Sequence, residues 1–112
     1  MELHCTKENE HSLAICVGPM EAESHTAFRE HLHPLFTRPG VKVLVDISRV
    51  PRINSQGIAA MVRLVADANT NGCHVVFAAP TPFVREVLKV TRLDGYFDVV
   101  ASQAEGLERL AQ

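Results

Sequence analysis

The first forty residues change their hydrophobic period from two to nearly four. Apolar residues alternate with other residues over 12–17 before a Gly-Pro pair, which predicts a strand that ends at that pair. We expect a weaker strand at 2–6 to pair with it. From Glu21 the apolar residues recur every three or four positions, which predicts an amphipathic helix that ends near Pro39-Gly40.

The middle of the chain has the pattern of a strand, a helix and a second strand. Residues 41–45 are a short, mostly β-branched run typical of a central strand covered on both faces, and Asp46 then opens a polar loop. A helical period follows from Ile58, and Asn71-Gly72 ends it as a C-terminal cap. Residues 73–79 repeat the buried-strand pattern. We therefore expect two parallel strands joined by a right-handed crossover.

The last third predicts a helix, a short strand at 96–100 and a closing helix. Thr81-Pro82 combines a capping residue with a proline in the first turn, which favours a helix start. Ser102 and Glu105 have the S-x-x-E spacing of a capping box. The apolar residues expected along these two helices are Phe83, Val87 and Val90 in the first and Leu107 and Leu110 in the second.

Together these elements predict one α/β domain over residues 1–112. Its sheet is expected to be mixed and mostly parallel, with four or five strands packed against about four helices. A length of 112 residues leaves no room for a second core. Hydrophobic residues at 46% and charged residues at 21% give the balance of a folded globular chain.

Charge and hydropathy exclude several classes of function. A net charge of -2 and a pI near 6.3 provide no basic field for nucleic acid. The longest apolar runs are far shorter than the roughly 20 residues that span a bilayer. The first ten residues carry charges and no apolar core, so we expect neither a signal peptide nor a membrane anchor, and a cytoplasmic protein.

The chemistry-bearing residues do not form a recognisable catalytic or metal motif. Three cysteines without a CxxC pair are expected to be buried, reduced thiols, with Cys16 and Cys73 inside apolar runs. His31 and His33 lie two residues apart, which is not the spacing of a zinc-binding helix. The scattered glycines match no phosphate-binding loop. We therefore predict no catalytic residue, no cofactor and no metal.

The most informative stretch is 45–58. It places Ser55 at a helix N-terminus directly after a buried parallel strand, at the sheet edge where α/β proteins usually carry functional loops. In the simplest structural interpretation, Asn54 or Ser55 caps the helix. An enzyme with Ser55 as nucleophile, assisted by His25 and Asp46, is an alternative hypothesis that no GxSxG motif supports.

The whole chain resembles the STAS domains of the bacterial anti-sigma factor antagonist family. That family has a D-x-S step after its central strand and then an apolar residue followed by D-S-S-G at a helix start. Here these segments are Asp46-Ile47-Ser48 and Ile53-Asn54-Ser55-Gln56-Gly57. A weaker match covers residues 18–21, where the family has a glycine before acidic and apolar residues.

The resemblance implies a phosphorylation switch. Ser55 would be the phosphoacceptor of an anti-sigma factor that is a serine kinase, and a serine phosphatase would reverse the modification. Binding of the anti-sigma factor would control sigma-factor-dependent transcription. The switch loop and partner-binding residues implied are Asp46, Ser48, Arg49, Arg52, Asn54, Gln56, Gly57, Ile58 and Glu21.

Two residues depart from the family pattern, because Asn54 replaces the usual aspartate and Gln56 the second serine. These departures favour an alternative function, a constitutive STAS subunit of a signalling scaffold or transporter complex without phosphorylation control.

Overall fold

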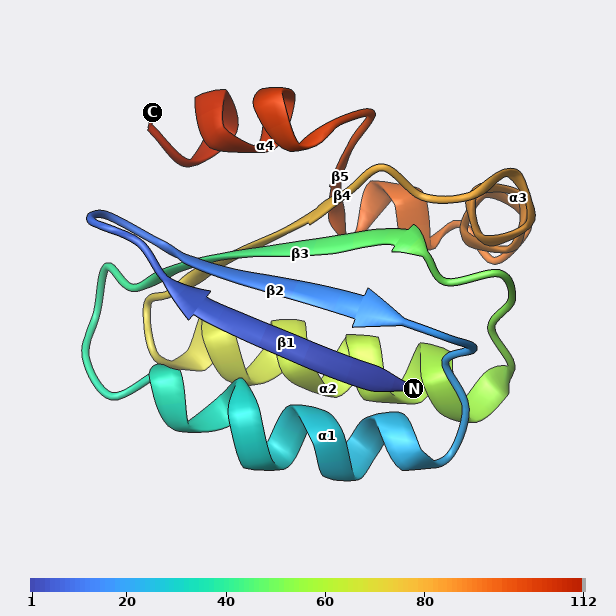
Figure 1. The fold of residues 1–112 in the computed structure, drawn as a ribbon, viewed down its shortest axis with the longest axis horizontal. Coiled ribbons are helices and arrows are strands. Elements are labelled where there is room, and N and C mark those ends of the chain that lie inside the picture. Colours follow the sequence, from blue (N-terminus) through green and yellow to red (C-terminus); the bar gives the residue numbers. More distant parts are fainter. Residues whose placement is uncertain (112) are drawn as a thin grey trace.

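A five-stranded sheet forms the centre of the computed structural model, which describes residues 1–111 (Figure 1). The strands lie side by side in chain order, and β1 is antiparallel to β2 while all later neighbours are parallel. Their bounds are β1 Glu2–Lys7, β2 Ser12–Val17, β3 Lys42–Arg49, β4 His74–Ala78 and β5 Asp98–Val100. The predicted mixed, mostly parallel sheet is confirmed.

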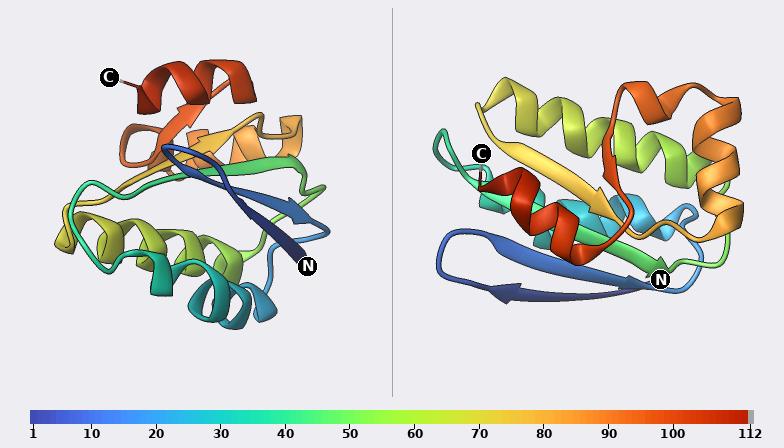
Figure 2. Two further views of the ribbon diagram at one scale, coloured as in Figure 1. Left: turned by 60° about the vertical axis from the view of Figure 1, so that its left-hand side comes forward. Right: turned by 90° about the horizontal axis from the view of Figure 1, so that it is seen from above.

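Helices cover both faces of this sheet. α1 and α2 lie under one face, α4 lies over the other, and α3 lies at the end where the parallel strands terminate (Figures 1 and 2). Two short 3₁₀ helices, η1 and η2, follow α1 and α3. The bounds are α1 Glu23–His31, η1 His33–Leu35, α2 Ser55–Thr70, α3 Pro82–Val90, η2 Leu93–Gly95 and α4 Gln103–Leu110.

Alternating strand residues supply two separate cores. Val43, Val45 and Ile47 of β3 face α1 and α2 in the larger core. Leu44 lies on the opposite face with Val76 and Leu110 in a smaller core under α4. Because β3 is buried on both sides, its near-continuous apolar sequence is explained.

β3 is longer than the sequence predicts. Asp46 does not open a loop: it continues the strand, opposite Ile15 of β2 and Ala78 of β4, and the strand ends at Arg49. The prediction failed because the apolar run stops at Asp46, and a buried carboxylate in a central strand requires hydrogen-bond partners that the strand pattern does not show. Hydrogen bonds from the N–H of Ser48, two residues along the strand, and from the distant side chain of Gln103 make it compatible.

The first helix is shorter than predicted. α1 ends at His31, and Pro34 then occupies the first turn of η1 instead of an α-helical position. A proline in a helix interior removes a hydrogen bond and clashes with the preceding turn. The apolar period thus continues past the α-helix itself.

α3 buries a different stripe from the predicted one. Val84 and Leu88 are its buried residues, whereas Phe83 is 53% exposed and Val90 is 71% exposed. In α4, likewise, Leu110 is buried but Leu107 is 43% exposed. Both helices carry more apolar residues than their packed faces accommodate.

The cysteine prediction is confirmed for Cys16 and Cys73 and wrong for Cys5. The first two are buried free thiols, while Cys5 is exposed on the edge strand β1. Burial raises the pKa of Cys16 to about 12. Its thiol is therefore protonated at neutral pH, as expected of an apolar core residue.

Candidate functional site

The loop between β3 and α2 is held in place by backbone hydrogen bonds to the segment after β2. The N–H of Met20 donates to Arg52 O at 3.0 Å, and the N–H of Asn54 donates to Met20 O at 3.1 Å. These bonds form an isolated parallel bridge between Met20 and Ile53. The loop is therefore an extension of the sheet, and it fixes where α2 begins.

Asn54 caps α2. Its side-chain oxygen accepts hydrogen bonds from the N–H groups of Gln56 and Gly57, both at 3.0 Å. Of the two capping residues that the sequence allowed, the structure selects Asn54. Ser55 is consequently the first helical residue, and it is exposed, as is Gln56.

Gly57 is required by close packing against Met20. A Cβ atom at this position would lie 2.2 Å from the carbonyl oxygen of Met20 and 2.9 Å from the side chain of Ile53. The first contact involves backbone that is itself hydrogen-bonded to Asn54. Gly57 therefore allows the start of α2 to lie directly against the chain that precedes α1.

Asp46 and Ser48 lie on the other face of the sheet from α2. One carboxylate oxygen of Asp46 accepts from the N–H of Ser48 at 2.8 Å, and the other accepts from the amide of Gln103 at the start of α4. Within residues 1–111, neither oxygen hydrogen-bonds to the segment that starts α2. Asp46 thus anchors α4, while Ser48 is exposed near the strand end.

The environment of Asp46 favours its charged form. Burial alone would raise its pKa, but hydrogen bonds from Gln103 and Ser48 and the charge of Arg49 outweigh that effect, so the pKa lies below its ordinary value. Gln103 could not be foreseen as a partner, because it lies 57 positions along the chain from Asp46.

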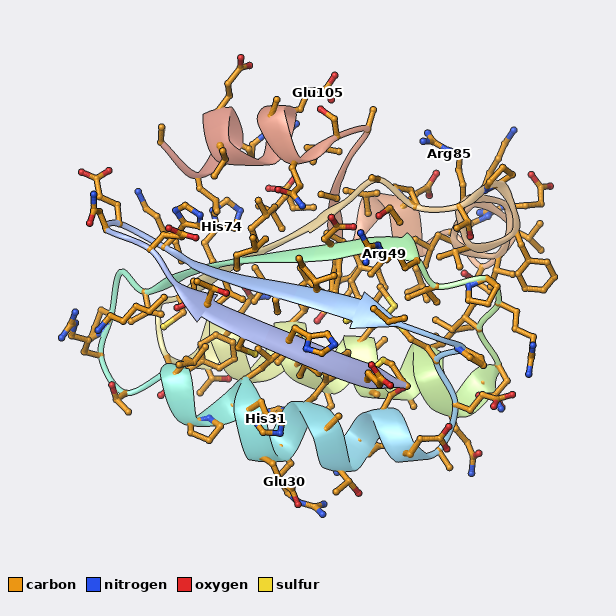
Figure 3. The ribbon with its side chains drawn as sticks, in the orientation of Figure 1. Glu30, His31, Arg49, His74, Arg85 and Glu105 are labelled. Carbon is orange, nitrogen blue, oxygen red and sulfur yellow. The ribbon has the colours of Figure 1, made fainter. Side chains whose placement is uncertain are left out.

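Charged residues surround the loop. Arg52 forms an ion pair with Glu21, with 3.8 Å between Nε and the carboxylate oxygen, so Glu21 lies beside the loop. Arg49 is exposed at the end of β3, the end of the molecule where Arg85 of α3 also lies (Figure 3). Ile58 is half-buried on α2. Glu21, Arg52, Asn54, Gln56, Gly57 and Ile58 thus lie at the loop or in the first turn of α2, whereas Arg49 lies at the end of β3, where its charge acts on Asp46.

The histidines are dispersed among the elements. His31 of α1 and His74 of β4 lie on separate elements (Figure 3). His74 bonds to Asp98 at 2.8 Å, and His33 bonds to Asp67 at 2.6 Å. In the part of the chain that the structure describes, no three His, Cys, Asp or Glu side chains gather as a metal site would require. Over the same residues, no helix combines the length and apolar character needed to cross a membrane.

Comparison with known families identifies the fold. The family model described as "Mlab, STAS domain" matches residues 7–101. The chain belongs to the STAS domain family. The D-x-S step and the helix start at Asn54 both lie inside the matched region.

Solved STAS structures superpose over nearly the whole chain. A protein from Thermotoga maritima, described provisionally as an anti-sigma factor antagonist, has a TM-score of 0.86 at 15% identity, with 98% of this chain and 95% of that one covered. A STAS domain protein from Planctomyces limnophilus gives 0.80 at 20% identity, covering 98% of both chains. The anti-sigma factor antagonist SpoIIAA in its unphosphorylated form gives 0.79 at 14% identity, covering 98% and 96%. These similarities establish the STAS fold over nearly the whole chain.

Proposed function

We propose that this STAS domain is an anti-sigma factor antagonist that binds a serine-kinase anti-sigma factor through the start of α2 and is released when Ser55 is phosphorylated. The observation that carries the proposal is the position of Ser55. Its side chain is exposed at the first position of a capped, 16-residue helix whose first turn contains no acidic residue. A kinase can reach this hydroxyl without unfolding the domain.

A phosphoryl group on Ser55 would be compatible with the folded state. It would add a charge of about -1.5 to -2 next to the positive end of the α2 dipole, where anions are favoured. Asn54 already satisfies two N–H groups of this turn, and Arg52 lies two residues before the cap. Phosphorylation should therefore leave α2 intact and act on the partner.

The partner would be the component that phosphorylation disfavours. If the partner packs over the start of α2, a phosphoryl dianion at Ser55 loses its hydrating water. The partner would then supply no positive charge to replace that water. Burying such an unpaired charge costs several kcal/mol, which converts tight binding into weak binding. The unphosphorylated domain is the binding form, and a serine phosphatase would restore it in the cytoplasm.

A constitutive subunit is the second candidate function. The family description that matches this chain names Mlab rather than an antagonist, and Asn54 and Gln56 differ from the antagonist pattern. In this alternative the same surface binds a scaffold or transporter subunit, and Ser55 is only the first residue of α2.

We propose no catalytic role for Ser55. His25 belongs to α1 under one face of the sheet, while Asp46 bonds to Gln103 on the face covered by α4. The three groups of the hypothetical triad are therefore distributed over separate parts of the domain, unlike a nucleophile, base and orienting acid in hydrogen-bonded sequence.

Baits that differ only at Ser55 test the proposal. Ser55→Ala and Ser55→Asp would be used to retain proteins from an extract of the source organism, and retained proteins would be identified by mass spectrometry. Ala66→Asp is a matched control, because it adds the same charge to the exposed side of α2 about 16 Å along the helix.

The proposal predicts a kinase-like protein on the Ser55→Ala and Ala66→Asp baits that is missing from the Ser55→Asp bait. Identical proteins on all three, rich in scaffold or transporter subunits, would contradict it and support the constitutive subunit.

A further inference from the structure

A cavity of about 200 Å³ lies between α1 and α2. The two helices pack side by side under one face of the sheet and run in the same direction (Figures 1 and 2). The residues that line the cavity are His25, Phe28, Arg29 and His33 from α1 and η1, and Ala60 and Arg63 from α2. Four of these six residues are histidine or arginine, and none is acidic. We call this space the α1–α2 cavity.

Helical spacing brings these residues to one groove. His25 and Arg29 lie four positions apart on α1, so they share one side of that helix. Ala60 and Arg63 lie three positions apart on α2 and likewise share one side. Phe28 and Ala60 are each 1% exposed, whereas Arg29 and Arg63 are exposed. The groove therefore combines buried apolar residues with an arginine from each helix.

An acidic residue of α2 is held outside the α1–α2 cavity. Oδ2 of Asp67 accepts from Nδ1 of His33 at 2.6 Å, and its Oδ1 accepts from Nδ2 of Asn71 at 3.1 Å. Both carboxylate oxygens are thus occupied, and Asp67 does not line the cavity. The bond to His33 also ties η1 to α2, so it fixes the two sides of the cavity relative to each other.

The charges of Arg29 and Arg63 are not neutralised by the domain. Among residues 1–111, neither guanidinium forms an ion pair. Glu21, which precedes α1, pairs with Arg52. Glu30 is exposed on α1, where Figure 3 shows it pointing away from the sheet, and it does not line the cavity. A cleft with charge of one sign and apolar walls concentrates the electrostatic field, so the α1–α2 cavity favours an anion.

A larger cavity beside the β1–β2 turn shows the contrast. It measures about 550 Å³ and is lined by carboxylates as well as cations, namely Glu8, Glu10, Lys7, Arg38 and Lys42. Because both signs of charge are present, its lining favours no particular ligand charge. The α1–α2 cavity differs, because its charged residues are all basic.

We propose that the α1–α2 cavity binds a small phosphate monoester. Such a ligand carries a charge of about -1.5 to -2 at neutral pH, which matches the two unpaired guanidinium charges. Its terminal oxygens can accept paired N–H bonds from both arginines, whereas the two oxygens of a carboxylate suit a single arginine. His25 lines the same cavity and can donate a further hydrogen bond.

The volume of the α1–α2 cavity limits the size of the ligand. Pockets for drug-sized ligands measure about 300–1,000 Å³, so a cavity of about 200 Å³ fits a phosphate group with a short organic substituent. A phospholipid headgroup has the same phosphate chemistry, but the net charge of -2 opposes an anionic membrane. A soluble monoester is therefore the favoured source.

The α1–α2 cavity extends beyond the proposed function. Arg63 lies eight residues after Ser55, which is about 12 Å along α2. The site is thus separate from the helix start that we assign to the anti-sigma factor, and it can be tested without the partner.

Titration with ethyl phosphate tests the α1–α2 cavity directly. The full chain would be titrated at constant ionic strength and followed by NMR amide shifts, with propionate as a carboxylate of similar length. We expect saturable shifts on α1, η1 and α2, with a dissociation constant of about 1 mM or lower. Propionate should bind at least about tenfold more weakly, because it cannot serve both arginines.

Removal of single charges locates the contact. Arg29→Gln and Arg63→Gln change exposed side chains, so both should fold, and each should weaken ethyl phosphate at least about tenfold. Arg85→Gln is the matched control, because it removes the same charge from an exposed position of α3 outside the cavity. It should leave the affinity unchanged.

Several results would overturn the proposal. These are the absence of saturable shifts, equal affinity for ethyl phosphate and propionate, shifts confined to other elements, or equal losses in Arg63→Gln and Arg85→Gln. Vesicles that contain phosphatidic acid distinguish the two sources of phosphate. If they retained the wild-type chain but not Arg63→Gln, while ethyl phosphate did not bind, the ligand would be a lipid headgroup and the soluble monoester would be contradicted.

Discussion

The free N–H groups at the N-termini of α2 and α4 are capped by different chemical groups. In α4, the hydroxyl of Ser102 accepts from the N–H of Glu105, and the carboxylate of Glu105 accepts from the N–H of Ala101, both at 3.1 Å. In α2, the cap is a neutral amide and the first turn has no acidic residue. α4 thus carries its own anion at its positive end, whereas α2 leaves that end available to an added one.

The glycines near these two helix starts show a second difference. Gly57 is constrained by the backbone carbonyl of Met20, whereas a Cβ at Gly106 would lie 2.4 Å from the side-chain Cδ1 of Leu44. A leucine side chain can change rotamer, but a hydrogen-bonded carbonyl cannot move alone. The start of α2 is therefore held in a fixed position, and its first turn has no acidic residue to offset the helix dipole. Both properties suit a site that must present Ser55 reproducibly.

The largest expected effect is that of Gly57→Ala. The new methyl group would force the start of α2 away from Met20, so we expect a loss of about 3 kcal/mol in the free energy of unfolding. Gly106→Ala should cost about 1 kcal/mol or less, because Leu44 can adjust and alanine is the better helix former. Urea denaturation of both variants measures the difference, and equal losses would show that α2 is no more constrained than α4.

Asp46 should stabilise the domain through α4. Asp46→Ala removes two hydrogen bonds to a charged acceptor, and we expect a loss of about 2 kcal/mol at pH 7. Because the pKa of Asp46 is lower in the folded state, its contribution is present above the unfolded pKa of about 4 and disappears as the pH falls through the folded value.

The measurement is urea denaturation of wild type and Asp46→Ala between pH 7 and pH 2. The difference in stability should shrink below about pH 4. A difference that stays constant over this range would mean that the carboxylate charge is not what stabilises the start of α4.

Loss of either cap should have a moderate and similar effect. Asn54→Ala and Ser102→Ala should each cost about 1 kcal/mol, since each removes the acceptor of free N–H groups at a helix start. Asn54→Asp should retain the native stability or exceed it slightly. Thermal melts would measure all three, and a strongly destabilised Asn54→Asp would contradict a start of α2 that accepts negative charge.

The smallest expected effects come from adding or removing a single charge at a helix N-terminus. Ser55→Asp should stabilise the isolated domain by about 0.5 kcal/mol, because it places an anion at the open end of α2. Glu105→Gln should destabilise it by a similar amount, because it removes the anion that α4 already has. Both effects on the free energy of unfolding should diminish in high salt. A destabilising Ser55→Asp would contradict the conclusion that the start of α2, unlike that of α4, can accept an added anion.

The parts of this fold that depend on local sequence were predictable. The periods of two and four gave the order of strands and helices, and Thr81, Ser102 and Asn71 cap their helices as their residue types favour. A capping side chain and the groups it bonds lie within four positions of each other, so the local sequence contains both partners.

The parts that depend on distant contacts were not predictable. Where β3 continues through Asp46, the buried carboxylate accepts a hydrogen bond from Gln103, which lies 57 positions further along the chain. The buried side of α3 could not be chosen locally, because Val84 with Leu88 and Phe83 with Val90 are both valid apolar stripes. At the candidate site, the sequence located Ser55 and Asn54 but placed Asp46 near them, whereas the sheet separates it from α2.

The central claim is that Ser55 at the open start of α2 is a phosphoacceptor, and site mapping tests it most directly. The wild-type chain and Ser55→Ala would be incubated with ATP and extract of the source organism, and phosphopeptides would be sequenced by mass spectrometry. We predict phosphate on Ser55 of the wild type and none at the corresponding position of the variant. Phosphate confined to other residues, or an unmodified Ser55 in an extract whose kinases are active, would contradict it.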